Sequence, residues 1–327
     1  MCELLALSSS SPARLTFSLQ ALAARGGASG SSHDGWGVAF YQGTDVALFR
    51  EPTAAADSAL VRFLETEGPA THLAISHIRH ATQGGVSLAN TQPFVRQLGG
   101  RAHVFAHNGN LPGIYRSDAL ALGSHRPVGQ TDSEHAFCAL LERLDEPWRA
   151  GTPPTAETRL SLLTAFAADL RALGPANFIY ADGDAVFAHG HRRLQRTSKR
   201  AEPPGLWMRQ RHCAPADPAP DDRGGAAIAQ EERSVVWIAS VPLTDEDWRP
   251  LAEGEVVAVR GGEALGSRPL AVRYNRRQAG APSIIQALVQ PSTAGRRQLF
   301  RPTTHSRARL AKVARDLRSF ACSRSRC

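Results

Sequence analysis

The sequence begins Met1-Cys2-Glu3-Leu4-Leu5, which places a cysteine directly after the initiator methionine. Methionine aminopeptidase generally removes Met1 before a small residue, so we expect Cys2 to become the amino terminus. Cys2 would then carry both a thiol and a free α-amine, whose ordinary pKa values are about 8.5 and about 8. A nucleophile needs a base nearby, and here the base belongs to the same residue. Taken alone, however, these five residues favour a simpler interpretation, a buried cysteine in a first strand.

The composition indicates a globular protein of the cytoplasm. The chain has 327 residues, of which 42% are hydrophobic, so it can bury a substantial core. No signal segment stands at the N-terminus, and no apolar run reaches the ~20 residues of a membrane span. The five cysteines are scattered and lack the spacing of zinc ligands. We therefore expect a cytoplasmic protein with free thiols, no membrane partner, no metal and no cofactor.

The positive charge of the chain is concentrated at its C-terminal end. The whole chain carries +8, and residues 266–327 carry 13 Arg and one Lys against one Asp, which is +13, so residues 1–265 carry −5. We predict a domain over 1–265 and a basic, disordered tail over 266–327, with a nascent basic helix over 306–320. No nucleic-acid-binding motif accompanies the tail, which disfavours a nucleic-acid partner.

Strand patterns lie on both sides of a helical middle, which favours two antiparallel sheets with helices outside them rather than alternating βαβ units. Helices are predicted over 15–24, 57–65, 133–144 and 159–173, and a surface loop over 215–225. Strands are predicted over 1–8, 38–41, 46–49, 72–80, 102–106, 177–180, 185–188, 206–209, 234–240 and 256–259. The predicted class is α+β.

Two motifs at strand ends offer groups for binding and catalysis. In His77-Ile78-Arg79-His80-Ala81-Thr82, the guanidinium of Arg79 could bind a carboxylate through two hydrogen bonds, although a lone arginine is more often a surface ion pair. In His107-Asn108-Gly109-Asn110, the Asn108 amide and the Gly109 N–H could form an oxyanion hole. An isolated Asn-Gly would instead be an ordinary hairpin turn.

Two further motifs have ordinary structural interpretations when each is taken alone. Gly129-Gln130-Thr131-Asp132-Ser133-Glu134 precedes a helical pattern, with Thr131 as the N-cap and Glu134 completing a capping box. Asp132 is then either a favourable residue of the first helical turn or a ligand for an ammonium group. His33-Asp34-Gly35-Trp36-Gly37 could be a glycine-rich turn with a core tryptophan.

Together, these motifs resemble the class-II glutamine amidotransferases, which are N-terminal-nucleophile hydrolases. The sequence is similar in particular to the stand-alone YafJ-like branch of that family. The resemblance covers roughly residues 1–261. It rests on the Cys2 stretch, His-Asp-Gly-Trp-Gly, Asn90-Thr91-Gln92-Pro93-Phe94, and Arg126 to Glu134, in this order and at similar spacing.

The resemblance implies a four-layer αββα sandwich and a role for each candidate residue. Cys2 would be the nucleophile, with its own α-amine as the general base. Asn108 and Gly109 would form the oxyanion hole. The substrate-binding residues would be Arg79, with Thr82 nearby, for the α-carboxylate and Asp132 for the α-ammonium group. The substrate would be glutamine, and a γ-glutamyl thioester would form on Cys2 as ammonia leaves.

Two departures from the family leave the γ-glutamyl substrate open. Other branches usually have a glycine where this chain has Glu3, and many have a tryptophan where it has His80. No acceptor domain is visible in the sequence, so ammonia would pass to a separate acceptor enzyme or be released. Three alternatives stay open: a hydrolase of γ-glutamyl peptides or thiol metabolites, a glutamine-sensing module without activity, and a nucleic-acid-binding role of the tail.

Overall fold

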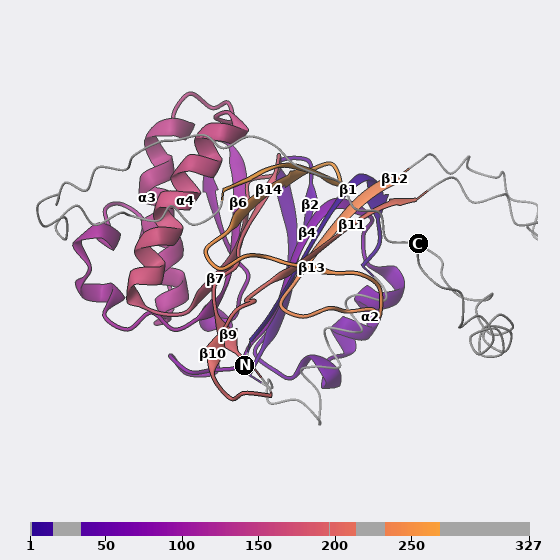
Figure 1. The fold of residues 1–327 in the computed structure, drawn as a ribbon, viewed down its shortest axis with the longest axis horizontal. Coiled ribbons are helices and arrows are strands. Elements are labelled where there is room, and N and C mark those ends of the chain that lie inside the picture. The colour runs from indigo at the N-terminus through magenta and orange to yellow at the C-terminus, as the bar shows by residue number, and fades with distance from the viewer. Residues whose placement is uncertain (1, 16–33, 196, 214–232, 269–327) are drawn as a thin grey trace, which may run out of the picture. The chain divides into compact units, whose positions relative to one another are not determined.

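The computed structural model describes residues 2–15, 34–195, 197–213 and 233–268, and these form four layers (Figure 1). Two antiparallel sheets pack face to face, and helices cover the outer face of each sheet. This is the αββα sandwich that the resemblance implied. The predicted helix over 15–24 lies outside the described residues from 16 onward, as do the loop over 215–225 and the tail beyond 268.

The first sheet holds the strand that follows Cys2. Its members are β1 (Glu3–Ala13), β2 (Trp36–Gln42), β3 (Asp45–Glu51), β4 (Thr71–Ile78), β11 (Trp207–Cys213), β12 (Arg233–Ala239) and β13 (Arg249–Pro250). They lie in the order β13-β11-β12-β1-β4-β2-β3. Because β1 lies between β12 and β4, the residue that precedes it is held at a fixed place beside the end of β4.

The second sheet holds the strand that ends in Asn108 and Gly109. Its members are β5 (Phe94–Leu98), β6 (Arg101–Gly109), β7 (Ala176–Ala181), β8 (Val186–His189), β14 (Val256–Arg260) and β15 (Glu263–Arg268). They lie in the order β15-β14-β8-β7-β6-β5. A separate short hairpin joins β9 (Arg193–Leu194) to β10 (Ala201–Glu202).

Three α-helices form the described part of the outer layers: α2 (Ala59–Glu67), α3 (Asp132–Trp148) and α4 (Ala156–Leu173). Helices α3 and α4 pack on the second sheet through aromatic contacts, such as the stacked rings of Phe105 and Phe137. Helix α2 buries Val61 and Leu64 against the first sheet. No described helix has both the length and the apolar character that a membrane span requires.

Strand β1 is buried on both of its faces from Leu4 to Leu7. Leu4 and Ala6 belong to the apolar layer between the sheets, whereas Leu5 and Leu7 belong to the layer on the outer side. Successive strand residues point to opposite faces of a sheet, so a strand covered on both sides is apolar at every position. The start of this sandwiched strand is therefore a rigid support for Cys2.

Several element boundaries differ from those predicted. Strand β1 continues through the serines to Ala13, with a bulge after Ser8, because pairing with β4 and β12 outweighs the weak strand tendency of serine. Strands β5, β9, β10, β13 and β15 were not predicted, and all of them are short or at an edge. Strand β15 also runs to Arg268, three residues beyond the predicted domain boundary.

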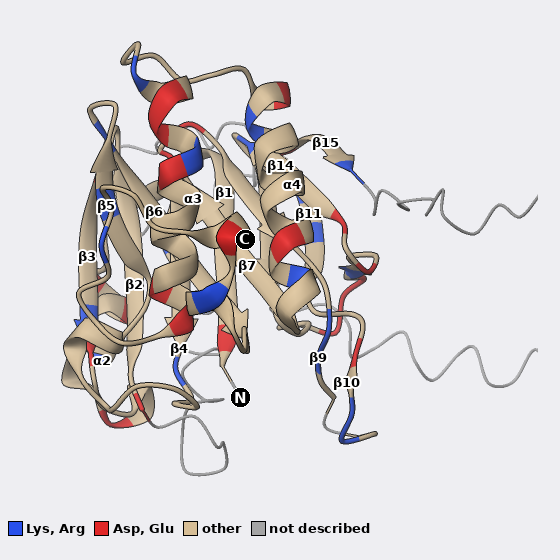
Figure 2. Ribbon diagram, turned by 90° about the vertical axis from the view of Figure 1, so that its left-hand side faces the viewer, with Lys and Arg blue, Asp and Glu red and all other residues tan. Residues whose placement is uncertain are grey.

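Figure 2 shows both acidic and basic residues along α3 and α4. The two helices thus present a mixed charge surface, in keeping with the small net charge of residues 1–265. Arg159 of α4, in contrast, is buried. Its guanidinium lies 2.6 Å from Asp182 and 2.5 Å from Asp184, which joins α4 to the turn between β7 and β8.

Replacing Arg159 with methionine should lower the free energy of unfolding by about 3–5 kcal/mol, because it leaves buried Asp182 without its ion-pair partner. Burial alone would raise the pKa of Asp184, but Arg159 and Arg260 outweigh burial and lower it. The stabilisation from Asp184 is therefore present above the ordinary aspartate pKa of about 3.9 and is lost as the pH falls below it.

Urea unfolding measures the change, with Arg149→Met as the control. The Arg149 side chain is 73% exposed and lies 4.0 Å from Asp145, so its loss should change the unfolding free energy by less than about 0.5 kcal/mol. Equal losses in the two variants would contradict the assigned role of the buried pair.

Candidate active site

Cys2 lies beside the end of β4. Pairing of Glu3 with Ile78 aligns the start of β1 with that end, and the Cys2 thiol then meets the backbone of His80. The His80 N–H donates to Sγ at 3.2 Å, and Sγ donates to the His80 carbonyl at 3.4 Å. The side chain is half-buried. His80 therefore supports the thiol through its backbone, which explains why its side chain can differ from the tryptophan of other branches.

No imidazole nitrogen of the described residues is a hydrogen-bond partner of this thiol. The hydrogen bonds of the sulfur are those with the His80 backbone. Burial, with a further contribution from the charge of Arg79, lowers the pKa of His77 to about 3. Burial also lowers the pKa of His107. Burial raises the pKa of the Cys2 thiol, and the hydrogen bond from His80 opposes this.

Asn108 reaches the backbone of Cys2. Its side-chain Nδ2 donates to the Cys2 carbonyl at 2.7 Å. Asn108 and Gly109 are the last residues of β6 and pair with Asn177 and Ala176 of β7, so the alternative interpretation of Asn-Gly as a hairpin turn is wrong. Strand pairing holds these two donors more rigidly than a turn would. A Cβ at position 109 would lie 2.0 Å from the Pro175 carbonyl oxygen, so only glycine fits there.

Arg79 is a buried cation at the exit of β4, only 3% exposed. Its terminal nitrogens donate to the backbone carbonyls of Gln83, Gly84 and Gly85, at 3.1–3.2 Å, and more weakly to that of Asp34. The loop after β4 is thus wrapped around the guanidinium. Among the described residues, no carboxylate forms an ion pair with Arg79.

Asp132 is a buried anion at the start of α3, 5% exposed. Its Oδ1 accepts from the Ser133 N–H at 2.8 Å, and its Oδ2 accepts from the Leu111 N–H at 2.9 Å. In the described part of the chain, no Lys, Arg or His pairs with it. Leu111 follows β6 by two residues, so the Leu111 bond ties Asp132 to the chain that carries Asn108 and Gly109.

The capping prediction at α3 is confirmed for one partner and wrong for the other. Thr131 is the N-cap, and its hydroxyl accepts from the Glu134 N–H at 3.2 Å. The Glu134 carboxylate does not return this bond. It accepts instead from the Val128 and Gly129 N–H groups and from Arg96, so it shapes the loop that leads to Asp132.

The structure thus links most of the predicted site residues in one network. Cys2 contacts His80, the neighbour of Arg79, and also contacts Asn108. A hydrogen bond of 2.7 Å from Gln83 to Asn110 joins the loop around Arg79 to the end of β6. Thr82 is the exception, because its side chain is exposed and makes no hydrogen bond with another described residue.

Other residues of this network were not predicted to have a role. Asp34 accepts from the Ala81 N–H at 2.7 Å and so closes the loop after β4. Asn90 and Asn177 are buried amides that hold loops and strands behind the site. Asp34 and Asn90 lie inside quoted motifs, and this was the sequence signal that could have identified them. For Asn177, the sequence offered no signal beyond a predicted strand.

Glu3, the other residue that departs from the family pattern, forms a buried ion pair. The guanidinium of Arg193 lies 3.0 and 3.2 Å from its two carboxylate oxygens. Arg193 also donates to the Ser240 carbonyl, and the Ser240 hydroxyl accepts from the Leu4 N–H at 2.9 Å. A glycine could not make this contact. The pair fastens the first residues of β1 to β9 and to the end of β12.

Glu3→Gln should move the pH midpoint of Cys2 alkylation to lower values, because the Glu3 charge is one of the groups that raise the Cys2 pKa. Removing a nearby negative charge favours the thiolate, and we expect a shift of about 0.3–1 pH unit. Iodoacetamide modification of Cys2, quantified by peptide mass spectrometry across a pH series, measures it. Glu253→Gln is the control, since Glu253 pairs with the adjacent Arg192 at the surface. An unchanged midpoint in Glu3→Gln would refute the prediction.

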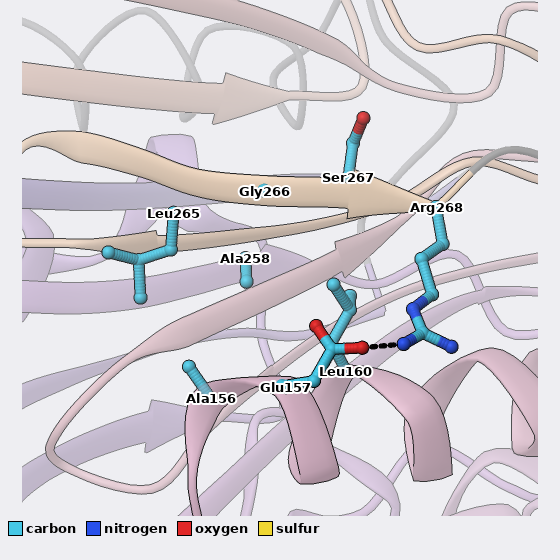
Figure 3. A pocket seen from close by; sticks show the side chains of 8 residues that line it. All are labelled: Ala156, Glu157, Leu160, Ala258, Leu265, Gly266, Ser267 and Arg268. Carbon is cyan, nitrogen blue, oxygen red and sulfur yellow. Dashed lines mark ion pairs between the residues drawn. The ribbon is translucent and has the colours of Figure 1, made fainter.

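A small cavity of about 120 Å³ lies elsewhere, between α4 and β15, and Figure 3 shows the Glu157–Arg268 ion pair at its side. None of the predicted site residues lines this cavity. Its lining consists of Ala156, Glu157, Leu160, Ala258, Leu265, Gly266, Ser267 and Arg268.

Comparisons with known proteins show the family of the chain. Residues 1–281 match the family described as "Glutamine amidotransferases class-II". The chain therefore belongs to the class-II glutamine amidotransferases.

Particular relatives follow from the same comparisons. The chain is 38% identical over 201 residues to the "Putative glutamine amidotransferase YafJ" of Escherichia coli (strain K12), covering 62% of this chain and 77% of that protein. A crystal structure of a "predicted glutamine amidotransferase from Pseudomonas aeruginosa PA01" is 34% identical, with a TM-score of 0.55, and covers 81% of this chain and 100% of its own.

A more distant likeness concerns the fold alone. The "allosteric regulatory enzyme of purine biosynthesis" is 15% identical, with a TM-score of 0.50, over 82% of this chain and 48% of that one. The likeness thus extends to the αββα sandwich that the sequence resemblance implied.

Proposed function

We propose that the protein is a glutaminase-type amidohydrolase whose Cys2 attacks the side-chain amide of glutamine. One observation carries this proposal: Arg79 and Asp132 are buried and opposite in charge, and neither forms an ion pair with another described residue. Burying an unpaired charge is costly, so such groups are kept where a ligand completes them. A free amino acid offers one carboxylate and one ammonium group, which match Arg79 and Asp132 in number and in sign.

In the proposed reaction, the Cys2 thiol loses its proton to its own α-amine, which removal of Met1 has exposed. The sulfur bonds to the amide carbon of glutamine, and the Asn108 side chain and the Gly109 N–H stabilise the oxyanion that forms. The C–N bond then breaks, the α-ammonium returns the proton to the leaving nitrogen, and ammonia departs. Water finally cleaves the γ-glutamyl thioester, which yields glutamate and restores the thiol.

The test combines intact mass with substrate turnover. Active protein should lack Met1, and a glutamine diazo-ketone analogue should add once, at Cys2. Active protein that retains Met1 would refute the α-amine as the base. Ammonia release from glutamine, compared with glutamate release from γ-glutamyl peptides, identifies the substrate class. Turnover of the peptides alone would replace glutamine as the proposed substrate.

A further inference from the structure

Asn90 is a buried amide that joins two loops of the site. It ends the single helical turn Leu88–Asn90 and is only 1% exposed. Its Nδ2 donates to the Gly85 carbonyl at 3.0 Å and to the Gln130 side-chain oxygen at 3.3 Å. Its Oδ1 accepts from the Gln130 N–H at 2.8 Å. Both N–H donors and the oxygen of the amide therefore have a partner, which fixes its orientation.

The two loops that Asn90 joins carry the proposed substrate anchors. The Gly85 carbonyl that accepts from Asn90 also accepts from the Arg79 guanidinium at 3.1 Å. On the other side, Gln130 lies two residues before Asp132. One side chain thus connects the cation to the anion through the Gly85 carbonyl and the Gln130 backbone.

The glycines of both loops make this close contact possible. A Cβ at position 84 would lie 2.8 Å from Asn90 Nδ2, and a Cβ at position 129 would lie 2.2 Å from Asn90 Oδ1. Both distances are too short for any side chain, so it is the backbone of each loop that contacts the Asn90 amide. Packing of this kind leaves little freedom for either loop to shift relative to the other.

We propose that Asn90 is a positioning residue that fixes the separation of Arg79 and Asp132 and thereby the preference for a substrate with a free α-amino-acid end. The inference rests on the proposed function, because it takes Arg79 and Asp132 as the two anchors. Asn90 acts on binding through these residues and contacts no reacting atom. Its loss should therefore weaken binding of the substrate more than it slows the chemical step.

Asn177 provides a matched comparison at the oxyanion side. It is also a buried asparagine, 1% exposed, and its Nδ2 donates to the Asn108 carbonyl at 3.0 Å and to the Arg192 carbonyl at 2.8 Å. Asn177 thus holds the strand end that carries the proposed oxyanion hole and touches neither anchor. Removing it should lower kcat rather than raise KM.

The experiment compares Asn90→Ala with Asn177→Ala in the full chain. For glutamine, Asn90→Ala should raise KM roughly 10- to 100-fold, the range expected for loss of hydrogen bonds that orient charged groups, and should change kcat by less than about 3-fold. Labelling of Cys2 should slow with the glutamine diazo-ketone analogue but not with iodoacetamide, which has no amino-acid end. Asn177→Ala should show the opposite split, with kcat reduced.

Two further variants keep the result interpretable if Asn90→Ala folds poorly. Gln130→Ala removes an exposed partner of Asn90 and should raise KM to a smaller extent, whereas Gln97→Ala removes an exposed amide of β5 and should change nothing. The role of Asn90 would be overturned if Asn90→Ala slowed Cys2 labelling by the diazo-ketone analogue and by iodoacetamide to the same degree. A fall in kcat with KM unchanged would also overturn it. If the wild-type protein neither turns over glutamine nor reacts with its diazo-ketone analogue, the proposed function fails first, and this inference fails with it.

Discussion

Cys2→Ala should reduce kcat/KM for glutamine by at least about 10⁴-fold, because it removes the only group proposed to bond covalently to the substrate. The fold should persist. The thiol is half-buried, and its hydrogen bonds are those with the His80 backbone. Alanine is also small, so removal of Met1 should still occur and the variant should differ from the mature protein by the sulfur alone. Ammonia release and covalent labelling by the diazo-ketone analogue measure the effect.

Cys138→Ala is the matched control. Cys138 lies in α3, is fully buried, and has a pKa that burial raises to about 11. A thiol of this kind is protonated at neutral pH and inaccessible to a substrate, so its loss should leave both the activity and the single label in place. Full activity in Cys2→Ala, or a label that moves to Cys138, would show that the nucleophile has been misassigned.

Much of the fold was predictable because its central strands are buried and form short runs rich in apolar residues. The patterns of β1, β4 and β7 predicted strands, and those of α3 and α4 predicted helices, since apolar periodicity records which faces are covered. The strands that were missed are short or at sheet edges, where few side chains are buried. The sequence of such a strand therefore lacks the pattern of apolar residues that would identify it.

The end of β6 shows how tertiary structure overrides a local signal. Asn108-Gly109 has the composition of a tight turn, yet both residues continue the ladder with β7. Position 109 is glycine because the Pro175 carbonyl lies where a side chain would be. A close approach of this kind involves residues far apart in the sequence, so the local pattern could not distinguish it from a turn.

The site residues were predicted from motifs, whereas the contacts that hold them were not. The motifs named Cys2, Arg79 and Asp132, because the resemblance assigns roles at matching positions. The pairing of Glu3 with Arg193 spans 190 residues, and the contact of Asn108 with Cys2 spans 106. Neither spacing leaves a periodic trace. Residues that act by orienting others are therefore found only from coordinates.

Asn108→Ala should lower kcat for glutamine by about 100- to 1000-fold and leave KM nearly unchanged, because an oxyanion-hole donor acts on the charge that develops during the reaction. The Asn108 amide already lies within hydrogen-bond distance of the Cys2 backbone, and strand pairing with β7 fixes its place. The backbone donor at Gly109 would remain, so the loss should be smaller than that in Cys2→Ala.

Asn110→Ala separates this effect from general damage to the end of β6. Its side chain accepts from Gln83 at the surface, and its backbone N–H keeps its bond to Pro175 in the variant. We expect a change in kcat of less than about 10-fold, since only one exposed hydrogen bond is lost. Steady-state kinetics of both variants, with iodoacetamide labelling of Cys2 to confirm that the thiol is still reactive, decides the matter. An Asn108→Ala enzyme with wild-type kcat would mean that the oxyanion is stabilised by other groups, and the assignment of Asn108 would have to be withdrawn.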